Sequence, residues 1–315
     1  MAWPVSGRTS DAEFFRFYGR KLMMEGLAPI DGWAVLAIMA KTADYVAALL
    51  VMGGPLFMLA FRAAPVDVLR LARMITFTAV LVGIAILALR FGIRAARISG
   101  MGLDGATNTM MLGFVWDSPL GTAAIWRSVG AFLVLAVYIE GIVSIGIAFV
   151  GGLLIAASYT FVGHSLADPR WILASFLTVH LLVAAFWIAS LVPLYRVAEQ
   201  KDAPILLHRF GKIASATVTV LVIVGMTFAW LMVGSITALF TTAYGWVLLT
   251  KLAFVTGLMG LAAHNKWRLV PALEMGEASA ATHLKRSILI EIIAIFMILI
   301  ATATLTSVTT PPINL

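Results

Sequence analysis

His180 is the residue of this sequence whose type and position most clearly suggest chemistry. It lies inside a stretch without charged residues, 171–195, which is long enough to cross a membrane. An ionisable side chain near the middle of a bilayer is costly to bury and is by default a candidate functional residue. Ala184 and Trp187 follow on the same helical face, and the small Ala184 leaves space beside the imidazole. Because imidazole binds transition metals well, we expect either a metal site at His180 or a packing histidine that is hydrogen-bonded to a neighbouring helix.

Other soft metal ligands precede this stretch in the sequence. Three methionines lie in the polar stretch 98–118, where they have no apolar run to fill: Met101, Met110 and Met111. Thioether sulfur suits Cu(I), and His164 follows later in the run Gly163-His164-Ser165. These residues predict a route by which a soft metal ion reaches His180 from one side of the membrane. The alternatives are a hydrophobic plug on the membrane surface for the methionines and a wetted loop residue for His164.

Charged residues inside apolar stretches are the third group with chemical potential. There are four such residues: Lys41, Asp44, Lys251 and Glu291. Lys41 and Asp44 are three positions apart on one helix, so we expect them to pair with each other. Glu291 is expected to meet His264 or Arg268, and Lys251 needs another acceptor, for which Asp44 is one candidate. We interpret these groups as structural polar residues rather than as a proton relay, because buried ions are usually paired.

Several kinds of chemistry are excluded by what the sequence lacks. It contains no cysteine, so disulfides, thiolate nucleophiles, iron–sulfur clusters and cysteine metal sites are ruled out. It also has no phosphate-binding GxxxxGK[ST] loop, no HExxH, no GxSxG and no dinucleotide fingerprint. We therefore expect a protein that is not an enzyme and does not hydrolyse ATP by itself. Any metal must be held by histidine, methionine, carboxylate or backbone oxygen.

The composition shows what kind of scaffold positions these residues. Of 315 residues, 62% are apolar and only 12% are charged, and the mean hydropathy is +1.01. A soluble domain carries about 25% charged residues, so this is the composition of an integral membrane protein. The formal net charge is +7, but the basic residues lie at the ends of apolar runs. They indicate membrane topology and contact with anionic headgroups rather than nucleic-acid binding.

The apolar stretches predict eight membrane spans, since about 20 helical residues cross a hydrocarbon core of about 30 Å. One charge-free stretch, 213–250, would be about 57 Å long as a single helix and must turn between Gly234 and Gly245. The expected spans are 33–61, 74–89, 122–139, 141–162, 171–195, 213–233, 244–264 and 287–310. We predict an all-α fold, a polytopic membrane helix bundle. Residues 28–315 form one membrane domain, and residues 1–27 form an amphipathic segment on the membrane surface.

The distribution of lysine and arginine predicts the orientation. These residues are concentrated in two links of the second half, 196–212 and 264–286. By the positive-inside rule both links are cytoplasmic. With eight spans, both termini, the stretch 98–118 and the turn around His164 then face the outside. The stretch 266–285 is expected to be a polar loop.

Ordered motifs in this sequence resemble those of the copper resistance protein D family. The run His180-Leu181-Leu182 to Leu191, with Trp187 seven positions after His180, resembles a signature of that family, as does Gly163-His164-Ser165 before it. Further matching positions follow the family's order: Asp117 to Gly121 with Arg127, Arg209-Phe210, Tyr244-Gly245 with Lys251, Ala262 to Lys266, and Arg286-Ser287 with Glu291. The resemblance covers about residues 117–312.

The resemblance implies a multi-pass protein of the bacterial inner (cytoplasmic) membrane that transports copper or takes part in copper homeostasis and resistance. Copper, as Cu(I) or Cu(II), is then the substrate. The expected metal ligands are His164, His180 and the three methionines of the stretch 98–118. The expected partners are the lipid bilayer and a periplasmic copper-binding protein, and no nucleic acid is expected.

Two other functions remain open from the residues alone. A haem-binding redox protein with two axial histidines needs both at a similar depth, whereas only His180 is central, so a haem held by a single histidine is the form left open. A membrane partner that docks a periplasmic copper carrier without transporting copper would need only the outer loop and would not depend on His180.

Overall fold

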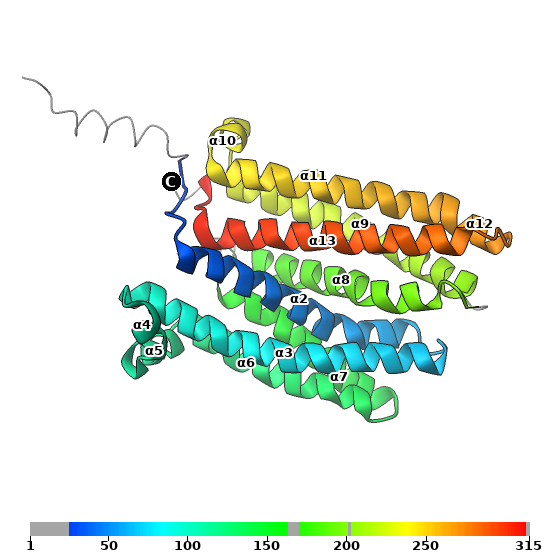
Figure 1. Cartoon of the computed structure of the whole chain (residues 1–315), viewed down its shortest axis with the longest axis horizontal. Coiled ribbons are helices and arrows are strands. Elements are labelled where there is room, and N and C mark those ends of the chain that lie inside the picture. Colours follow the sequence, from blue (N-terminus) through cyan, green and yellow to red (C-terminus); the bar gives the residue numbers. More distant parts are fainter. Residues whose placement is uncertain (1–24, 163–169, 201–202, 313–315) are drawn as a thin grey trace, which may run out of the picture.

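The computed structural model describes residues 25–162, 170–200 and 203–312 as a bundle of long helices (Figure 1). Eight helical segments of this part are long and apolar enough to cross a membrane, as the sequence predicts. The all-α expectation is therefore confirmed. Their helices are α2 (Gly32–Ala60), α3 (Val66–Ser99), α6 (Pro119–Val134), α7 (Ile142–Ser158), α8 (Arg170–Val197), α9 (Ala203–Val233), α11 (Ala243–His264) and α13 (Ala280–Val308).

Short helices cap the two ends of the bundle. Three of them, α4 (Gly102–Thr107), α5 (Thr109–Trp116) and α10 (Ile236–Thr241), lie at the same end, and α12 (Val270–Glu274) lies at the other (Figure 1). Single-turn 3-10 segments, Leu135–Tyr138 and Tyr159–Phe161, extend α6 and α7. Side-chain caps begin several helices: for example, Asp31 accepts from the backbone N–H of Ala34, and Thr242 accepts from that of Gly245.

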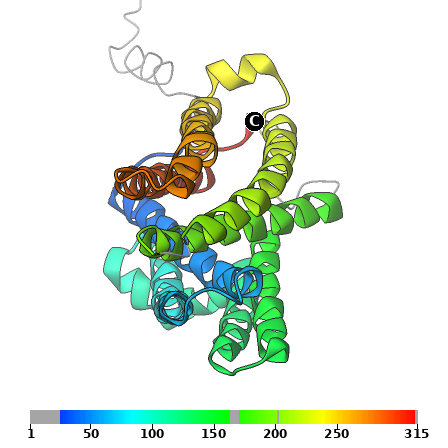
Figure 2. The ribbon, with the colours of Figure 1, turned by 90° about the vertical axis from the view of Figure 1, so that its right-hand side faces the viewer.

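The central element is α2, which packs against α3, α7, α8 and α13 (Figure 2). Small residues permit these close contacts, as is usual where membrane helices pack without a hydrophobic driving force. A Cβ atom at Gly53 would lie 2.1 Å from the carbonyl oxygen of Ala185 and 2.5 Å from Cβ of Ala189, both in α8. In the second half, α9 packs against α8 and α11 packs against α13.

The structure corrects the expected bounds of two helices and the expected loop character of two polar stretches. The helix α3 covers Val66–Ser99 rather than 74–89, and α9 begins at Ala203 rather than at residue 213. The stretch 98–118 forms α4 and α5, and most of 266–285 is helical, because a π-helical turn, Asn265–Leu269, and α12 prolong α11. Hydropathy reports where a helix leaves hydrocarbon, whereas backbone hydrogen bonding continues into the polar region.

The described N-terminal residues are bound to the ends of two helices. The backbone of Glu25 bridges to Thr242, and that of Leu27 bridges to Thr309. This places residues 25–28 against the start of α11 and the end of α13. The expected amphipathic segment, 1–27, lies outside the described residues except for its last three.

Candidate functional site

Four polar side chains follow one another through the second half of the bundle and are called the polar row here: His180, Trp187, Glu291 and Asn265. The first member of the polar row is His180. This residue lies in the middle of α8, and its Nδ1 atom is buried without a hydrogen-bond partner among the described residues. Lys251 of α11 is close enough to interact with the imidazole electrostatically. The arrangement disfavours a packing histidine tied to a neighbouring helix, because such a residue would have its buried nitrogen paired.

Glu291 of α13 also belongs to the polar row and is only 3% exposed. Its Oε1 atom accepts a hydrogen bond from Asn265 Nδ2 at 2.6 Å, and its Oε2 atom accepts from Trp187 Nε1 at 3.4 Å. The expected partners, His264 and Arg268, are wrong. Successive residues of a helix point about 100° apart, so Asn265 faces α13 while the neighbouring His264 side chain is exposed.

Two polar atoms of this row are buried without a partner. Five buried side-chain nitrogen or oxygen atoms lack a partner within the described part of the chain: one each on His180 and Asn265 of this row, one on Ser287 near the start of α13, and one each on Arg73 and Arg127. Trp187 links His180 to Glu291, because it lies two turns after His180 on α8 and its indole N–H donates to Glu291. An unpaired buried polar atom costs about 1–3 kcal/mol. Two of them in one row indicate a place where another polar or ionic species fits.

The row offers nitrogen and oxygen donors one at a time rather than as a closed cage. No group of three or more histidine or acidic side chains within residues 25–162, 170–200 and 203–312 is placed to share a metal ion. Within the described residues, His180 is therefore not part of a group of three or more such ligands.

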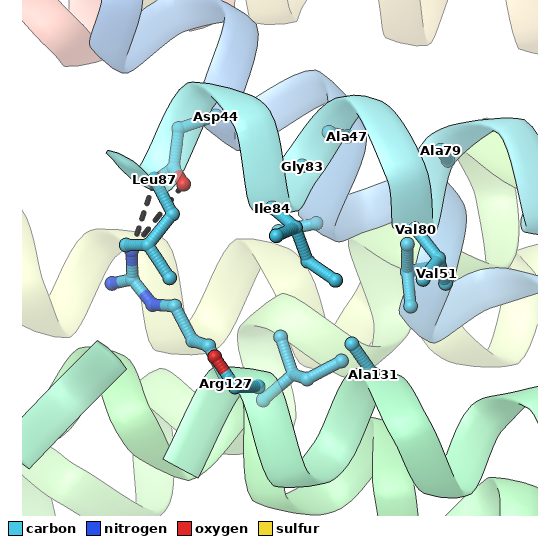
Figure 3. A pocket seen from close by; sticks show the side chains of 13 residues that line it. Asp44, Ala47, Val51, Ala79, Val80, Gly83, Ile84, Leu87, Arg127 and Ala131 are labelled. Atoms are coloured by element: carbon cyan, nitrogen blue, oxygen red, sulfur yellow. Dashed lines mark hydrogen bonds and ion pairs between the residues drawn. The ribbon is translucent and has the colours of Figure 1, made fainter. Parts of the chain in front are cut away.

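A second polar centre lies in the first half of the bundle around Asp44, which is 3% exposed. Its carboxylate accepts hydrogen bonds from Arg90 of α3, from Arg127 of α6 at 3.0 Å, and from the Tyr159 hydroxyl at 3.1 Å. Arg127 Nε also donates to Ser158 Oγ at 2.9 Å. Figure 3 shows Asp44 and Arg127 at one end of a pocket that is lined elsewhere by apolar residues and by Ser128.

The expected pairing of Lys41 with Asp44 is wrong, and so is Asp44 as the acceptor for Lys251. Lys41 Nζ donates to the carbonyl oxygen of Thr306 in α13 at 2.8 Å. The carboxylate of Asp44 is already paired with the guanidinium groups of Arg90 and Arg127. Guanidinium binds carboxylate through a rigid fork of donors that an ammonium lacks. Lys251 forms no ion pair with any acid that the structure describes.

The Asp44 centre has the chemistry of a structural joint. It connects α2, α3, α6 and the end of α7, and its carboxylate is saturated by donors. Two guanidinium groups surround the single carboxylate, with the Lys41 ammonium one helical turn away, so a cation would be repelled there. The first half of the bundle is therefore a poor path for a metal ion, in contrast to the row from His180 to Glu291.

The predicted ligands of the outer segment are not brought next to His180. The side chains of Met101 and Met110 are 56% and 64% exposed, and Met111 at the start of α5 is partly buried. Met101 directly precedes α4, and Met110 and Met111 lie in α5. Both helices pack mainly on α3 rather than on α8. His164 lies outside the described residues. A methionine and His164 route to His180 therefore stays a prediction.

Several residues of the two centres were not assigned a role from sequence. Arg90 was placed outside the membrane because it directly follows an apolar run, and α3 continues past it. Signals for two others existed: Arg127 follows the run 117–121, and Asn265 is part of Ala262 to Lys266. Nothing in the sequence pattern pointed to Tyr159 or to the orphaned hydroxyl of Ser287.

Two family models match the chain and together cover most of it. The model described as copper resistance protein D-like, N-terminal domain, matches residues 30–174, and the model described as copper resistance protein D matches residues 204–305. The match thus begins well before residue 117, where the resemblance seen in the sequence begins. His180 lies between the two matched ranges, whereas Asp44, Lys251 and Glu291 lie inside them. No curated protein and no solved structure matches the chain.

Proposed function

We propose that this chain, which belongs to the copper resistance protein D family, carries copper ions across the bacterial cytoplasmic membrane by way of His180. Membership of the family supports a role in copper resistance or copper handling in general. Eight apolar helices support a multi-pass membrane protein. The step from copper handling to copper passage is our inference from the polar row in the second half of the bundle.

One observation carries the proposal, namely the buried and unpaired Nδ1 atom of His180. Neutral imidazole is a copper ligand through a ring nitrogen that is free of other bonds. The nitrogen lies in the middle of a membrane-spanning helix, where no water replaces a missing partner. A copper ion in transit would provide that partner, and the stability lost through the unpaired atom would be offset when the site is loaded.

Lys251 sets the electrostatic conditions at this station. Its side chain interacts with His180 and has no acidic partner among the residues described. A charged ammonium group that acts electrostatically on the imidazole disfavours a cuprous ion at the same nitrogen. Copper therefore occupies His180 more easily when Lys251 has released its proton. Binding of copper at His180 is thus coupled to the loss of the positive charge of Lys251.

Glu291 and Asn265 lie on the other side of Trp187 along the same row. Glu291 is held by two donors, so its role in the proposal is to orient Trp187 and Asn265 rather than to ligate copper. The Oδ1 atom of Asn265 is left unpaired by this arrangement. We assign it no ligand role, because amide oxygen suits hard cations better than copper.

A haem-binding function is less well supported by the positions of the histidines. Among the described residues, His208 begins α9, and His264 and His283 lie at the same end of the bundle as α12. None of these shares the mid-helix depth of His180, as a haem with two axial histidines would require. The other alternative is that this chain docks a periplasmic copper carrier without transporting copper. That function gives no role to the unpaired nitrogen of His180.

Cu(I) binding by the purified protein tests the proposal. Competition with a cuprous chelator, combined with X-ray absorption spectroscopy, should show one copper ion with imidazole nitrogen in its shell. His180→Asn should weaken binding at least tenfold. Lys251→Met should tighten it several-fold, whereas Lys251→Arg, which keeps the charge, should not. Unchanged Cu(I) affinity in His180→Asn, or a Soret band with no copper binding, would contradict the proposal.

A further inference from the structure

A pocket at the α12 end of the bundle has a lining that the copper proposal does not use. It lies between α11 with its π-helical extension and the first three turns of α13. The space that a water-sized molecule can enter is about 410 Å³, within the range of about 300–1,000 Å³ that is usual for small-molecule sites. Its polar lining consists of His264, His283, Arg286 and Ser287.

The polar groups of this pocket are all able to donate hydrogen bonds. Arg286 provides guanidinium N–H groups and a permanent charge, and each imidazole carries at least one N–H. Ser287 is 6% exposed, and its Oγ atom is buried without a partner in the described part of the chain. A buried hydroxyl without a partner on the wall of a cavity favours a polar ligand there.

The charges of the lining select an anion over a cation. No acidic side chain lines the pocket. The nearest buried acid along α13 is Glu291, one turn beyond Ser287, and its two oxygens already accept from Trp187 and Asn265. Two imidazoles alone could also suggest copper, but the guanidinium of Arg286 on the same wall disfavours a metal ion. Arginine with hydroxyl and imidazole donors is instead a typical set for phosphate.

The remaining lining indicates what carries the phosphate. Leu261, Leu269 and Ile290 form the apolar part of the pocket, and the pocket opens between two helices that cross the membrane. A free phosphate ion gains nothing from aliphatic walls, whereas a lipid places its headgroup at a helix end and its acyl chains beside the span. Basic pockets between membrane helices at the cytoplasmic side are known to hold anionic headgroups.

We propose that this pocket binds the phosphate headgroup of an anionic membrane lipid. Arg286 pairs with the phosphate charge, Ser287 and the two histidines donate to its oxygens, and an acyl chain lies along Leu261 and Ile290. The bound lipid would fill the space between α11 and α13 and hold their ends together. This site does not depend on copper passage, because no residue of the His180 station takes part in it.

Lipid binding to the full-length purified protein tests this site. Native mass spectrometry and thermal unfolding in detergent should both register binding of phosphatidylglycerol, with little effect of zwitterionic phosphatidylcholine. Arg286→Gln should weaken phosphatidylglycerol binding at least tenfold, and Ser287→Ala should weaken it several-fold. Arg62→Gln is the matched control, because Arg62 is an exposed arginine in the turn between α2 and α3 at the same end of the bundle. It should bind the lipid as wild type does.

Three results would overturn the proposal. Equal affinity of the wild-type protein for the two lipids would remove the charge argument without needing any variant to fold. Stabilisation by inorganic phosphate alone, with none by phosphatidylglycerol, would show that the pocket takes a free ion. Cu(I) binding that disappears in the His264→Ala, His283→Ala double variant but persists in His180→Asn would reassign the pocket to a metal.

Discussion

At the scale of single residues, the Asp44 carboxylate and the His180 imidazole differ in whether they have hydrogen-bond partners, and the one unpaired atom beside Asp44 is Nη2 of Arg127. Asp44 receives donors from three side chains and is closed to further ligands. His180 has a buried nitrogen without a partner, and the same holds for the Oδ1 atom of Asn265. A saturated centre stabilises the fold, whereas an unsaturated one costs stability and is retained where a function needs it. This contrast is why the copper proposal rests on the second half of the bundle.

Glu291 provides a prediction at this scale. Replacement by Gln keeps an oxygen that accepts from Asn265 or Trp187, whereas Leu leaves both donors unpaired, at a cost of about 1–3 kcal/mol each. We therefore expect Glu291→Gln to fold with nearly the wild-type midpoint of thermal unfolding in detergent. Glu291→Leu should unfold at a clearly lower temperature. Equal midpoints for the two variants would show that the hydrogen bonds of Glu291 do not stabilise the bundle.

At the scale of elements, the contact between α2 and α8 determines where His180 and Trp187 point. Gly53 of α2 lies against the backbone of Ala185 and the side chain of Ala189. Its substitution by Ala would place a Cβ atom 2.1 Å from a backbone oxygen that cannot move independently of its helix. We expect Gly53→Ala to separate the two helices and to lower both the yield of folded protein and the midpoint of thermal unfolding.

Gly83 is the matched control for this substitution. It also lies in a membrane-spanning helix, but a Cβ atom there would meet only the side chain of Ala47, at 3.5 Å. Gly83→Ala should therefore be tolerated, and it also increases intrinsic helix propensity by about 1 kcal/mol. If size-exclusion profiles and unfolding midpoints show both variants to be alike, close packing at Gly53 does not hold α2 to α8.

Hydropathy predicted the number and order of the spans but not the lengths of the helices. The energetic rule that a span needs about 20 apolar residues finds the part of a helix inside hydrocarbon. It does not find helix ends, because α3 continues through Arg90, Arg94 and Arg97 to a left-handed cap at Gly100. The early end assigned to this helix is also why Arg90 was missed as a partner of Asp44.

Within the candidate site, residue types were predictable but partners were not. The depth of His180, and the burial of Asp44 and Glu291, follow from their places in apolar runs. Pairing across helices depends on which faces meet, and one sequence contains no information on that rotation. Asn265 takes the place beside Glu291 that was expected of its neighbour His264, and Lys41 binds the carbonyl oxygen of Thr306 instead of Asp44.

At the scale of the whole molecule, the bundle has two ends that the charge distribution assigns to opposite sides of the membrane. The predicted cytoplasmic end contains the turn 275–279, and the predicted outer end contains α10. Single cysteines at Ala278 and Thr237, both exposed, test this orientation without background because the chain has no native cysteine. In intact cells, a membrane-impermeant thiol reagent should label the variant Thr237→Cys and not Ala278→Cys. The reverse labelling would invert the orientation.

The central claim is that copper crosses the membrane by way of His180, and the initial rate of Cu(I) uptake into proteoliposomes tests it most directly. The comparison is between wild type, His180→Ala and Val179→Ala, since Val179 is the neighbouring position on α8 and is 43% exposed. At equal amounts of reconstituted protein, we predict that His180→Ala loses about 90% of the uptake rate or more, because no other imidazole among the described residues lies at that depth to replace it. Val179→Ala should transport copper as wild type does. Uptake by His180→Ala at the wild-type rate would contradict the claim and would favour a membrane partner that docks a periplasmic copper carrier.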